Sequence, residues 1–147
     1  MVRVLVLNGP NLNLLGTREP EVYGRETLAD VEARVRRRAA ALGCEVEFAQ
    51  TNHEGALIDR LHAARGAFDA VVLNPGGYAH TSVALRDAVA SIGLPVVEVH
   101  LSNIHAREPY RRRSLVAEAA RGCVVGLGAL GYELALEAAV RLAGKGM

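Results

Sequence analysis

The chain has 147 residues, of which 50% are hydrophobic and 22% charged, and its formal net charge is +1. These values predict one folded catalytic domain, residues 1–147, with a core of its own, and they exclude a disordered chain. Because nucleic-acid binding needs a strongly basic face, and because no apolar run approaches the roughly 20 residues that span a bilayer, we expect neither nucleic acid nor a membrane as a partner.

Short apolar runs alternate with segments of helical periodicity along most of the chain. The expected strands lie near residues 2–8, 44–50, 70–74, 95–101 and 122–127. The expected helices lie near residues 27–42, 53–65, 81–93 and 132–142, and residues 115–120 also look helical. This alternation predicts an α/β fold in which a parallel sheet has helices on both faces. Five strands in one domain favour a flavodoxin-like order.

Residues 9–25 interrupt this alternation because they show little apolar periodicity. A loop of this length is unusual unless it is functional, so we interpret it as a lid over a site. Residues 102–114 form a second irregular segment that is rich in His and Arg.

The two cysteines, Cys44 and Cys123, fall in apolar runs that look like strands. We therefore expect buried thiols rather than a disulfide or a nucleophile. The first residues already form a strand-like run, without the charged and apolar regions of a secretory leader. These features predict a protein of the reducing cytoplasm.

Polar side chains follow three of the expected strands at the point where each strand ends. In chain order they are Asn8 and Asn11, Asn74 and His80, and Glu98 and His100. The carboxyl ends of parallel strands meet at one edge of a sheet, which is where α/β proteins bind their ligands. We therefore predict an active site at this edge.

The asparagines allow two interpretations, because asparagine also tolerates left-handed backbone and bonds its own main chain. For Asn8, Asn13 and Asn103, a role in a turn and a contact with the ligand are equally open. Asn11 and Asn74 lie where strand ends meet the expected cleft, and we expect both to contact the ligand.

Four of the side chains have the chemistry of metal ligands, namely His80, Glu98, His100 and His105. However, Glu98 and His100 lie two positions apart on a strand, so they share one face of the sheet. This arrangement equally suits a carboxylate that orients a catalytic imidazole. We expect the second role and no metal ion.

The segment GLGALG at residues 126–131 has the spacing of a dinucleotide-binding loop. That motif requires a following strand and an acidic residue about 20 positions later, whereas sixteen residues follow Gly131. We therefore expect these glycines to allow close packing of a helix on a strand.

Tyr23 lies in the expected lid and is the candidate base. A phenol has a pKa near 10 and works as a base near neutral pH only beside cations. Arg18 is such a cation in the same loop, and Arg107 could supply another. One of the arginines at residues 111–113 could reach a hydroxyl or carboxylate of the ligand. We expect the arginines of the helix near 27–42 on its solvent face.

Five segments of the sequence carry a family resemblance. They are LNGPNLNLLGTREP at residues 7–20, YG at 23–24, QTNHEG at 50–55, LNPGGYAHTS at 73–82 and VEVHLSNIHARE at 97–108. Together they closely resemble type II 3-dehydroquinate dehydratases, in the family's order and spacing. The resemblance covers nearly the whole chain. It implies a flavodoxin-like fold, a homo-oligomer built as a dodecamer from trimers, and the cofactor-free trans-dehydration of 3-dehydroquinate to 3-dehydroshikimate in the shikimate pathway of aromatic amino-acid biosynthesis.

The resemblance also implies the roles of the catalytic residues. Tyr23 would be a tyrosinate that removes a proton from C2, beside the carbonyl, with Arg18 and Arg107 favouring the ionised form. Asn11 would hold the water that stabilises the enolate oxygen. His100 would be the general acid on the departing C1 hydroxyl.

Further matches are a positioning residue and several substrate-binding residues. Glu98 would fix the orientation and protonation of the imidazole. The binding residues are Asn74 and the main-chain amides of Leu101 and Ser102 for the carboxylate, His80 and Arg111 for the ring hydroxyls, and Asp87 from a neighbouring subunit. Pro109 and Tyr110 depart from the family's pattern, and this departure affects only the shape of one wall of the expected site.

An alternative from another class is a flavodoxin-like module that binds a nucleotide or flavin phosphate, with residues 75–77 as an anion-binding nest. Against it, the chain has no tryptophan and few aromatic residues for stacking. A yellow preparation would favour the module, and a colourless one with dehydratase activity the enzyme. An imine mechanism lacks a credible nucleophile, because Lys145, near the end of the sequence, is its only lysine.

Overall fold

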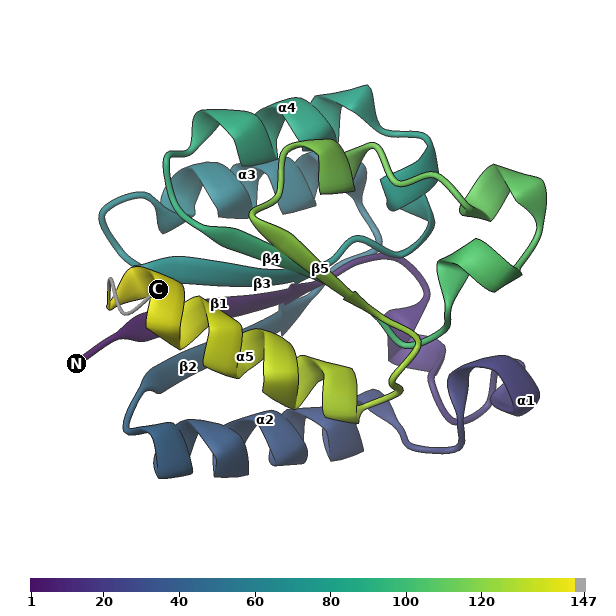
Figure 1. Cartoon of the computed structure of the whole chain (residues 1–147), viewed down its shortest axis with the longest axis horizontal. Coiled ribbons are helices and arrows are strands. Elements are labelled where there is room, and N and C mark those ends of the chain that lie inside the picture. Colours follow the sequence, from purple (N-terminus) through teal and green to yellow (C-terminus); the bar gives the residue numbers. More distant parts are fainter. Residues whose placement is uncertain (145–147) are drawn as a thin grey trace.

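The computed structural model describes residues 1–144 and contains a five-stranded parallel sheet between two layers of helices (Figure 1). The strands are β1 (Arg3–Asn8), β2 (Glu45–Gln50), β3 (Ala70–Asn74), β4 (Val96–His100) and β5 (Gly122–Val125). Their order in the sheet is β2-β1-β3-β4-β5, and all neighbouring strands pair in parallel. The predicted α/β fold with flavodoxin-like order is confirmed.

Helices cover both faces of this sheet. Helices α2 (Leu28–Leu42) and α5 (Leu130–Ala143) lie side by side on one face, and α3 (Glu54–Ala64) and α4 (Val83–Ser91) lie on the other. The short connecting elements are α1 (Pro20–Tyr23) and the 3-10 turns η1 (Leu12–Leu14), η2 (Gly76–His80), η3 (Ile104–Ala106), η4 (Pro109–Arg111) and η5 (Val116–Glu118). Residues 115–120, expected to be helical, form only the turn η5, because β5 begins four residues after it.

The central strands are apolar along most of their length because both of their faces are covered. In β1, Val4 and Val6 pack in the core beneath α2 and α5, whereas Leu5 and Leu7 pack in the core beneath α3 and α4. β3 divides its side chains between the two cores in the same way. The two cores therefore fix the carboxyl ends of neighbouring strands relative to one another.

The two cysteines differ in burial. Cys44, just before β2, is buried as predicted, but Cys123 is exposed, so the prediction of a buried thiol was wrong there. Cys123 belongs to β5, which lies at the edge of the sheet and is only partly covered. An apolar run does not reveal whether its strand will be central or at an edge.

Of the four arginines of α2, Arg36 and Arg37 are exposed as predicted, whereas Arg34 and Arg38 are partly buried in ion pairs. Arg34 forms salt bridges of 2.8 Å with Glu26 and 3.0 Å with Glu133. Arg38 pairs with Glu137. Because Glu133 and Glu137 belong to α5, these ion pairs join two helices that are distant in the sequence.

Of the three glycines at residues 126–131, Gly131 in the first turn of α5 has the packing role that we predicted, whereas a Cβ atom at Gly128 would meet nothing within 4 Å. A Cβ atom at Gly131 would lie 3.4 Å from side-chain atoms of both Val99 and Val124, so α5 begins directly against β4 and β5. Gly126 has a φ of +82° and turns the chain earlier than the expected strand end near 127.

Candidate active site

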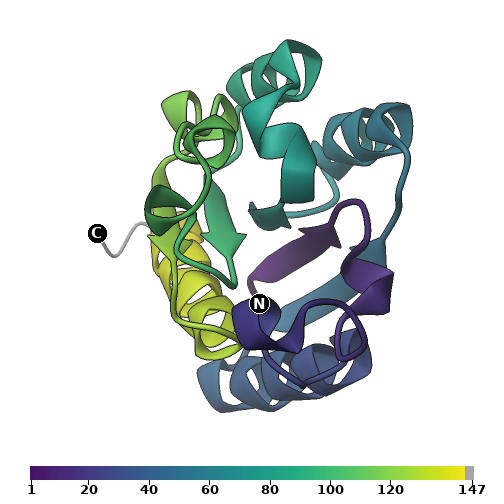
Figure 2. The same ribbon diagram turned by 90° about the vertical axis from the view of Figure 1, so that its right-hand side faces the viewer.

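A cleft lies at the carboxyl ends of β1, β3 and β4, as the polar strand ends predict. Figure 2 looks onto this edge of the sheet, with the loop after β1 (purple) on one side of the strand ends and the segment after β4 (green) on the other. The cleft is lined by Pro10, Asn11, Leu12, Arg18, Tyr23, Asn74, Gly76, Gly77, His80, His100, Leu101, Ser102, Ile104, Arg107 and Arg111. All the predicted site residues except Glu98 and Asp87 are among them.

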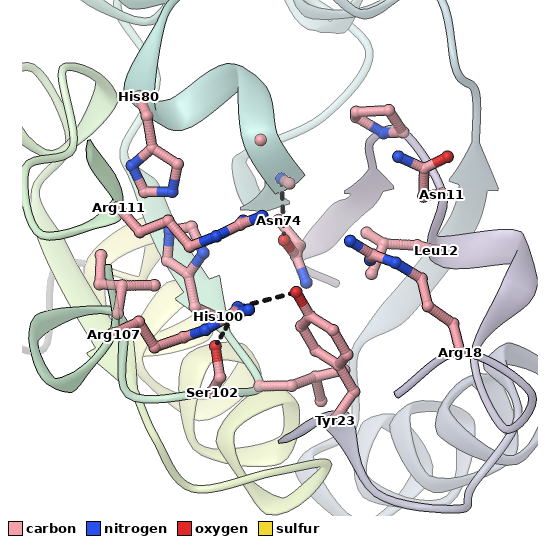
Figure 3. A pocket seen from close by; sticks show the side chains of 15 residues that line it. Asn11, Leu12, Arg18, Tyr23, Asn74, His80, His100, Ser102, Arg107 and Arg111 are labelled. Carbon is pink, nitrogen blue, oxygen red and sulfur yellow. Dashed lines mark hydrogen bonds between the residues drawn. The ribbon is translucent and has the colours of Figure 1, made fainter. Parts of the chain in front are cut away.

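The loop that carries Tyr23 is anchored to the core by buried leucines. Leu12 and Leu15 are almost fully buried and pack in the core beneath α2 and α5. Pro20 begins α1, where its fixed φ suits a first helical turn, and Gly24 ends it with a φ of +87°. Tyr23 is therefore the last residue of a short helix that faces the cleft (Figure 3). Movement of this loop as a lid stays a prediction.

Two guanidinium groups lie against the phenol of Tyr23 (Figure 3). Arg107 Nη1 donates a hydrogen bond of 2.7 Å to the Tyr23 hydroxyl oxygen. The guanidinium carbons of Arg18 and Arg107 lie 4.7 Å and 5.1 Å from the centre of the phenol ring. Burial lowers the pKa of Arg107, but the hydrogen bond and charge interaction with Tyr23 help to make the net shift upward. Arg107 stays a cation, so two positively charged groups lie beside the phenol of Tyr23.

A buried carboxylate holds the imidazole of His100. Glu98 is fully buried, and it points to the same face of β4 as His100 because the two are two residues apart. His100 Nε2 is hydrogen-bonded to Glu98 Oε2, which also accepts a bond of 2.7 Å from Ser114 Oγ. This pairing leaves Nδ1 as the imidazole nitrogen available to a ligand. Glu98 does not itself line the cleft, as expected of a residue that orients the imidazole.

The residues considered as metal ligands do not converge. His80 and His100 stack with their ring centres 6.2 Å apart. His105, however, is exposed, and its Nδ1 is hydrogen-bonded to the carbonyl of Arg112 outside the cleft. Within residues 1–144, His, Cys, Asp and Glu side chains form no group of three or more that could hold a metal ion.

The asparagines divide between structural and cleft-lining positions. Asn8 is fully buried, and its Nδ2 donates to the carbonyl of Ala49 at 3.0 Å. The side chain of Asn103 caps the turn η3 by accepting a main-chain amide at 3.1 Å. Asn11 lines the cleft in a left-handed conformation, with a φ of +68°, and its main-chain amide donates to Asn52 Oδ1 at 3.0 Å. Asn11 therefore combines the turn role with the cleft position.

Asn74 and the glycine loop after it line the cleft beside the loop that carries Asn11. The amide of Gly76 donates a bond of 3.1 Å to Asn74 Oδ1. A Cβ atom at Gly76 would lie 3.0 Å from Pro10 Cδ, so glycine allows the loops after β1 and β3 to meet. Sequence reasoning missed Pro10 and the apolar walls Leu12 and Ile104. The adjacent glycines and prolines of the two loops were the available signal.

His80 presents a neutral imidazole to the cleft. Its Nδ1 donates a hydrogen bond of 2.9 Å to the carbonyl of Arg113, because a carbonyl only accepts. Burial lowers the pKa of His80, and the neighbouring charges of His100 and Arg111 lower it further, although the bond to the carbonyl opposes them. The other nitrogen, Nε2, is therefore an acceptor near neutral pH.

Asp87 lies outside the cleft of its own chain. It belongs to α4, its side chain is exposed, and it forms a salt bridge of 3.1 Å with Arg86. A contribution to the cleft of a neighbouring subunit stays a prediction.

Known proteins are similar to this chain in sequence and in fold. The family model of dehydroquinase class II matches residues 2–140. The 3-dehydroquinate dehydratase of Desulforudis audaxviator is 60% identical over 145 residues, which cover 99% of this chain and 97% of the relative. The 3-dehydroquinate dehydratase of Dinoroseobacter shibae is 61% identical over 136 residues, which cover 92% of this chain and 91% of the relative. The crystal structure of the type II dehydroquinase from Butyrivibrio crossotus has a TM-score of 0.93 and 40% identity, covering 95% of this chain and 97% of that one. The chain therefore belongs to the class II dehydroquinase family.

Proposed function

We propose that this chain catalyses the cofactor-free trans-dehydration of 3-dehydroquinate to 3-dehydroshikimate, a step of the shikimate pathway in aromatic amino-acid biosynthesis, through an enolate intermediate. The family and its dehydratase relatives support the reaction and the substrate. The observation that carries the mechanism is the bond from Arg107 to the Tyr23 hydroxyl in the same cleft as His100. It supports the proposal because a phenol beside a cation and an imidazole line the same cleft.

In the first step, the ionised phenol of Tyr23 removes the proton from C2, beside the ketone. The electrons of the C–H bond move toward the carbonyl oxygen, which becomes an enolate. Arg18 and Arg107 favour the phenolate that acts as the base, because both cations lie against its ring. Asn11 holds a water against the enolate oxygen and so stabilises its developing charge.

In the second step, the enolate returns its electrons, the C1–C2 double bond forms, and the C1 hydroxyl departs. His100 gives this hydroxyl a proton from Nδ1, so that it leaves as water. The carboxylate of Glu98, held by Ser114, stabilises the imidazolium before the transfer. The base lies in the loop after β1 and the acid on β4, so the two can act on opposite faces of the ring, as trans elimination requires.

The remaining cleft residues match a small, hydroxylated anion. Asn74 and the main-chain amides of Leu101 and Ser102 bind the carboxylate. His80 accepts a hydrogen bond from one ring hydroxyl through Nε2, and Arg111 donates to another. Asn74 ends β3, and Leu101 and Ser102 directly follow β4.

An ultraviolet assay tests this function. The product has a carbon–carbon double bond that is conjugated with its ketone and absorbs ultraviolet light, whereas the substrate has no such double bond. We expect absorbance to rise on adding 3-dehydroquinate, and the rate to survive both a chelator and borohydride treatment with substrate. An imine would need a lysine, and the cleft-lining residues in the described part of the chain include none. Lys145 lies outside the described residues. Loss of activity on either treatment would contradict the proposed mechanism.

We further propose that the chain works in the cytoplasm as a homo-oligomer, a dodecamer arranged as a tetramer of trimers, in which Asp87 completes the cleft of a neighbour. The family resemblance supports this assembly. The exposed position of Asp87 on α4, away from its own cleft, supports the shared site.

Mixed oligomers test the shared site. We expect the Asp87→Ala and Tyr23→Phe chains to be defective alone and to restore activity after co-refolding. With random equal mixing, about one quarter of the clefts combine an intact Tyr23 with a neighbour's intact Asp87, so roughly that fraction of the wild-type rate should return. Mixed oligomers are confirmed by mass spectrometry. If recovery only equals the average of the two separate variants, Asp87 acts within its own subunit or merely pairs with Arg86.

A further inference from the structure

The hydroxyl of Tyr132 lies at the centre of a buried polar network that reaches the cleft from behind. Tyr132 is in the first turn of α5, and its side chain is completely buried. The hydroxyl donates a hydrogen bond of 2.7 Å to Asn8 Oδ1 and accepts one of 2.8 Å from Asn74 Nδ2. Asn8 and Asn74 are paired in the register of β1 and β3. One phenol thus joins the ends of two neighbouring strands.

The direction of every bond in this network is determined by main-chain groups at its two ends. The carbonyl of Ala49 can only accept, so the group of Asn8 that faces it is Nδ2. Asn8 Oδ1 must then accept from the hydroxyl of Tyr132, and the hydroxyl oxygen accepts from Asn74 Nδ2. At the other end, the amide of Gly76 can only donate, which requires Asn74 Oδ1 to face it. Both ends therefore specify the same orientation of the Asn74 carboxamide.

This orientation decides what Asn74 offers to a ligand. Its Oδ1 faces Gly76, and one of its two side-chain N–H groups faces Tyr132. The second N–H is left for the cleft, which Asn74 lines (Figure 3). A donor at this place attracts a carboxylate, whereas a flipped carboxamide would present an oxygen and repel it. Burial raises the pKa of Tyr132, so its hydroxyl keeps its proton and its direction at physiological pH.

We propose that Tyr132 is a positioning residue for substrate binding, because its hydroxyl locks the carboxamide of Asn74 with an N–H group directed at the substrate carboxylate. This inference rests on the proposed function, in which Asn74 binds that carboxylate. The Tyr132 side chain does not line the cleft, so its effect passes through Asn74.

The test compares Tyr132→Phe with a matched control. The Phe variant keeps the buried ring but removes one of the two bonds that orient Asn74, whose carboxamide is then held only by the Gly76 amide. We expect KM for 3-dehydroquinate to rise about tenfold or more while kcat changes by less than about threefold. Tyr78→Phe is the control, because its hydroxyl donates at 2.8 Å to the Asn52 carbonyl rather than to Asn74. We expect its KM to stay at the wild-type value.

A second comparison separates positioning from general destabilisation. In an Asn74→Ala background, adding Tyr132→Phe should leave KM unchanged, because the carboxamide that it positions is gone. A Tyr132→Phe variant with a lower melting temperature but a wild-type KM would overturn the inference. The inference would also be overturned if Tyr132→Phe raised KM equally in the wild-type and in the Asn74→Ala background. An inactive wild-type chain would instead contradict the proposed function.

Nuclear magnetic resonance keeps the inference testable if the Phe variant does not fold. In the ¹⁵N-labelled wild-type protein, the side-chain NH₂ signal of Asn74 should shift when 3-dehydroshikimate is added. A signal that stays in place at saturating 3-dehydroshikimate would show that the N–H group does not meet the carboxylate.

Discussion

Replacing Tyr23 with phenylalanine should lower kcat by about 10²- to 10⁴-fold and leave the fold intact. The large effect is expected because the hydroxyl oxygen is the atom that takes the substrate proton, and general base catalysis has this magnitude. The small structural effect is expected because Tyr23 is only partly buried, so losing its hydroxyl should change the free energy of unfolding by about 0.5 kcal/mol or less. Steady-state kinetics and thermal unfolding measure the two quantities.

Tyr110→Phe is the matched control for this experiment. Tyr110 is 66% exposed and lies outside the cleft-lining set. We expect its kcat to stay near the wild-type value. A Tyr23→Phe variant that turns over at a near-wild-type rate would move the base to another residue.

Replacing His100 with glutamine should also lower kcat by about 10²- to 10⁴-fold, but at the second step of the reaction. The variant still contains Tyr23 and Arg107, so it should still remove the C2 proton. In heavy water, we therefore expect the His100→Gln variant to exchange the C2 hydrogen of 3-dehydroquinate for deuterium without releasing product at a normal rate. Mass spectrometry of the recovered substrate measures this exchange.

The Tyr23→Phe variant is the comparison for the exchange experiment. It lacks the base, so it should incorporate little deuterium although its His100–Glu98 pair is intact. If His100→Gln abolished exchange as completely as Tyr23→Phe does, His100 would take part in proton removal. The assignment of acid and base would then have to be revised.

The sequence was sufficient to place most of the site because its signals are local. Asn74 and His100 end two apolar runs, and parallel strands bring such ends to one edge whatever the details of packing. The spacing of Glu98 and His100 likewise indicates their shared face, since side chains alternate along a strand.

Features that depend on contacts between distant segments could not be predicted in this way. The exposure of Cys123 depends on β5 lying at the edge of the sheet, and the ion pairs of Arg34 and Arg38 depend on α5 lying beside α2. The role of Tyr132 requires knowing that α5 begins behind the ends of β1 and β3. The proposed role of Asp87 involves a second chain, so it can be judged only from the assembly.

The hydrogen bond between Asn8 and Tyr132 joins residues 124 positions apart, which has a consequence for the order of folding. Contacts of such long range form only after the loop between them has closed, and they are therefore late events. We therefore expect β1, β3 and β4 to pair before α5 packs against them. At that stage the carboxamide of Asn74 would lack its bond to Tyr132, one of the two that orient it. Selectivity for an acidic ligand would therefore emerge only when the last helix docks, and a partly folded chain could not bind the ligand with full affinity.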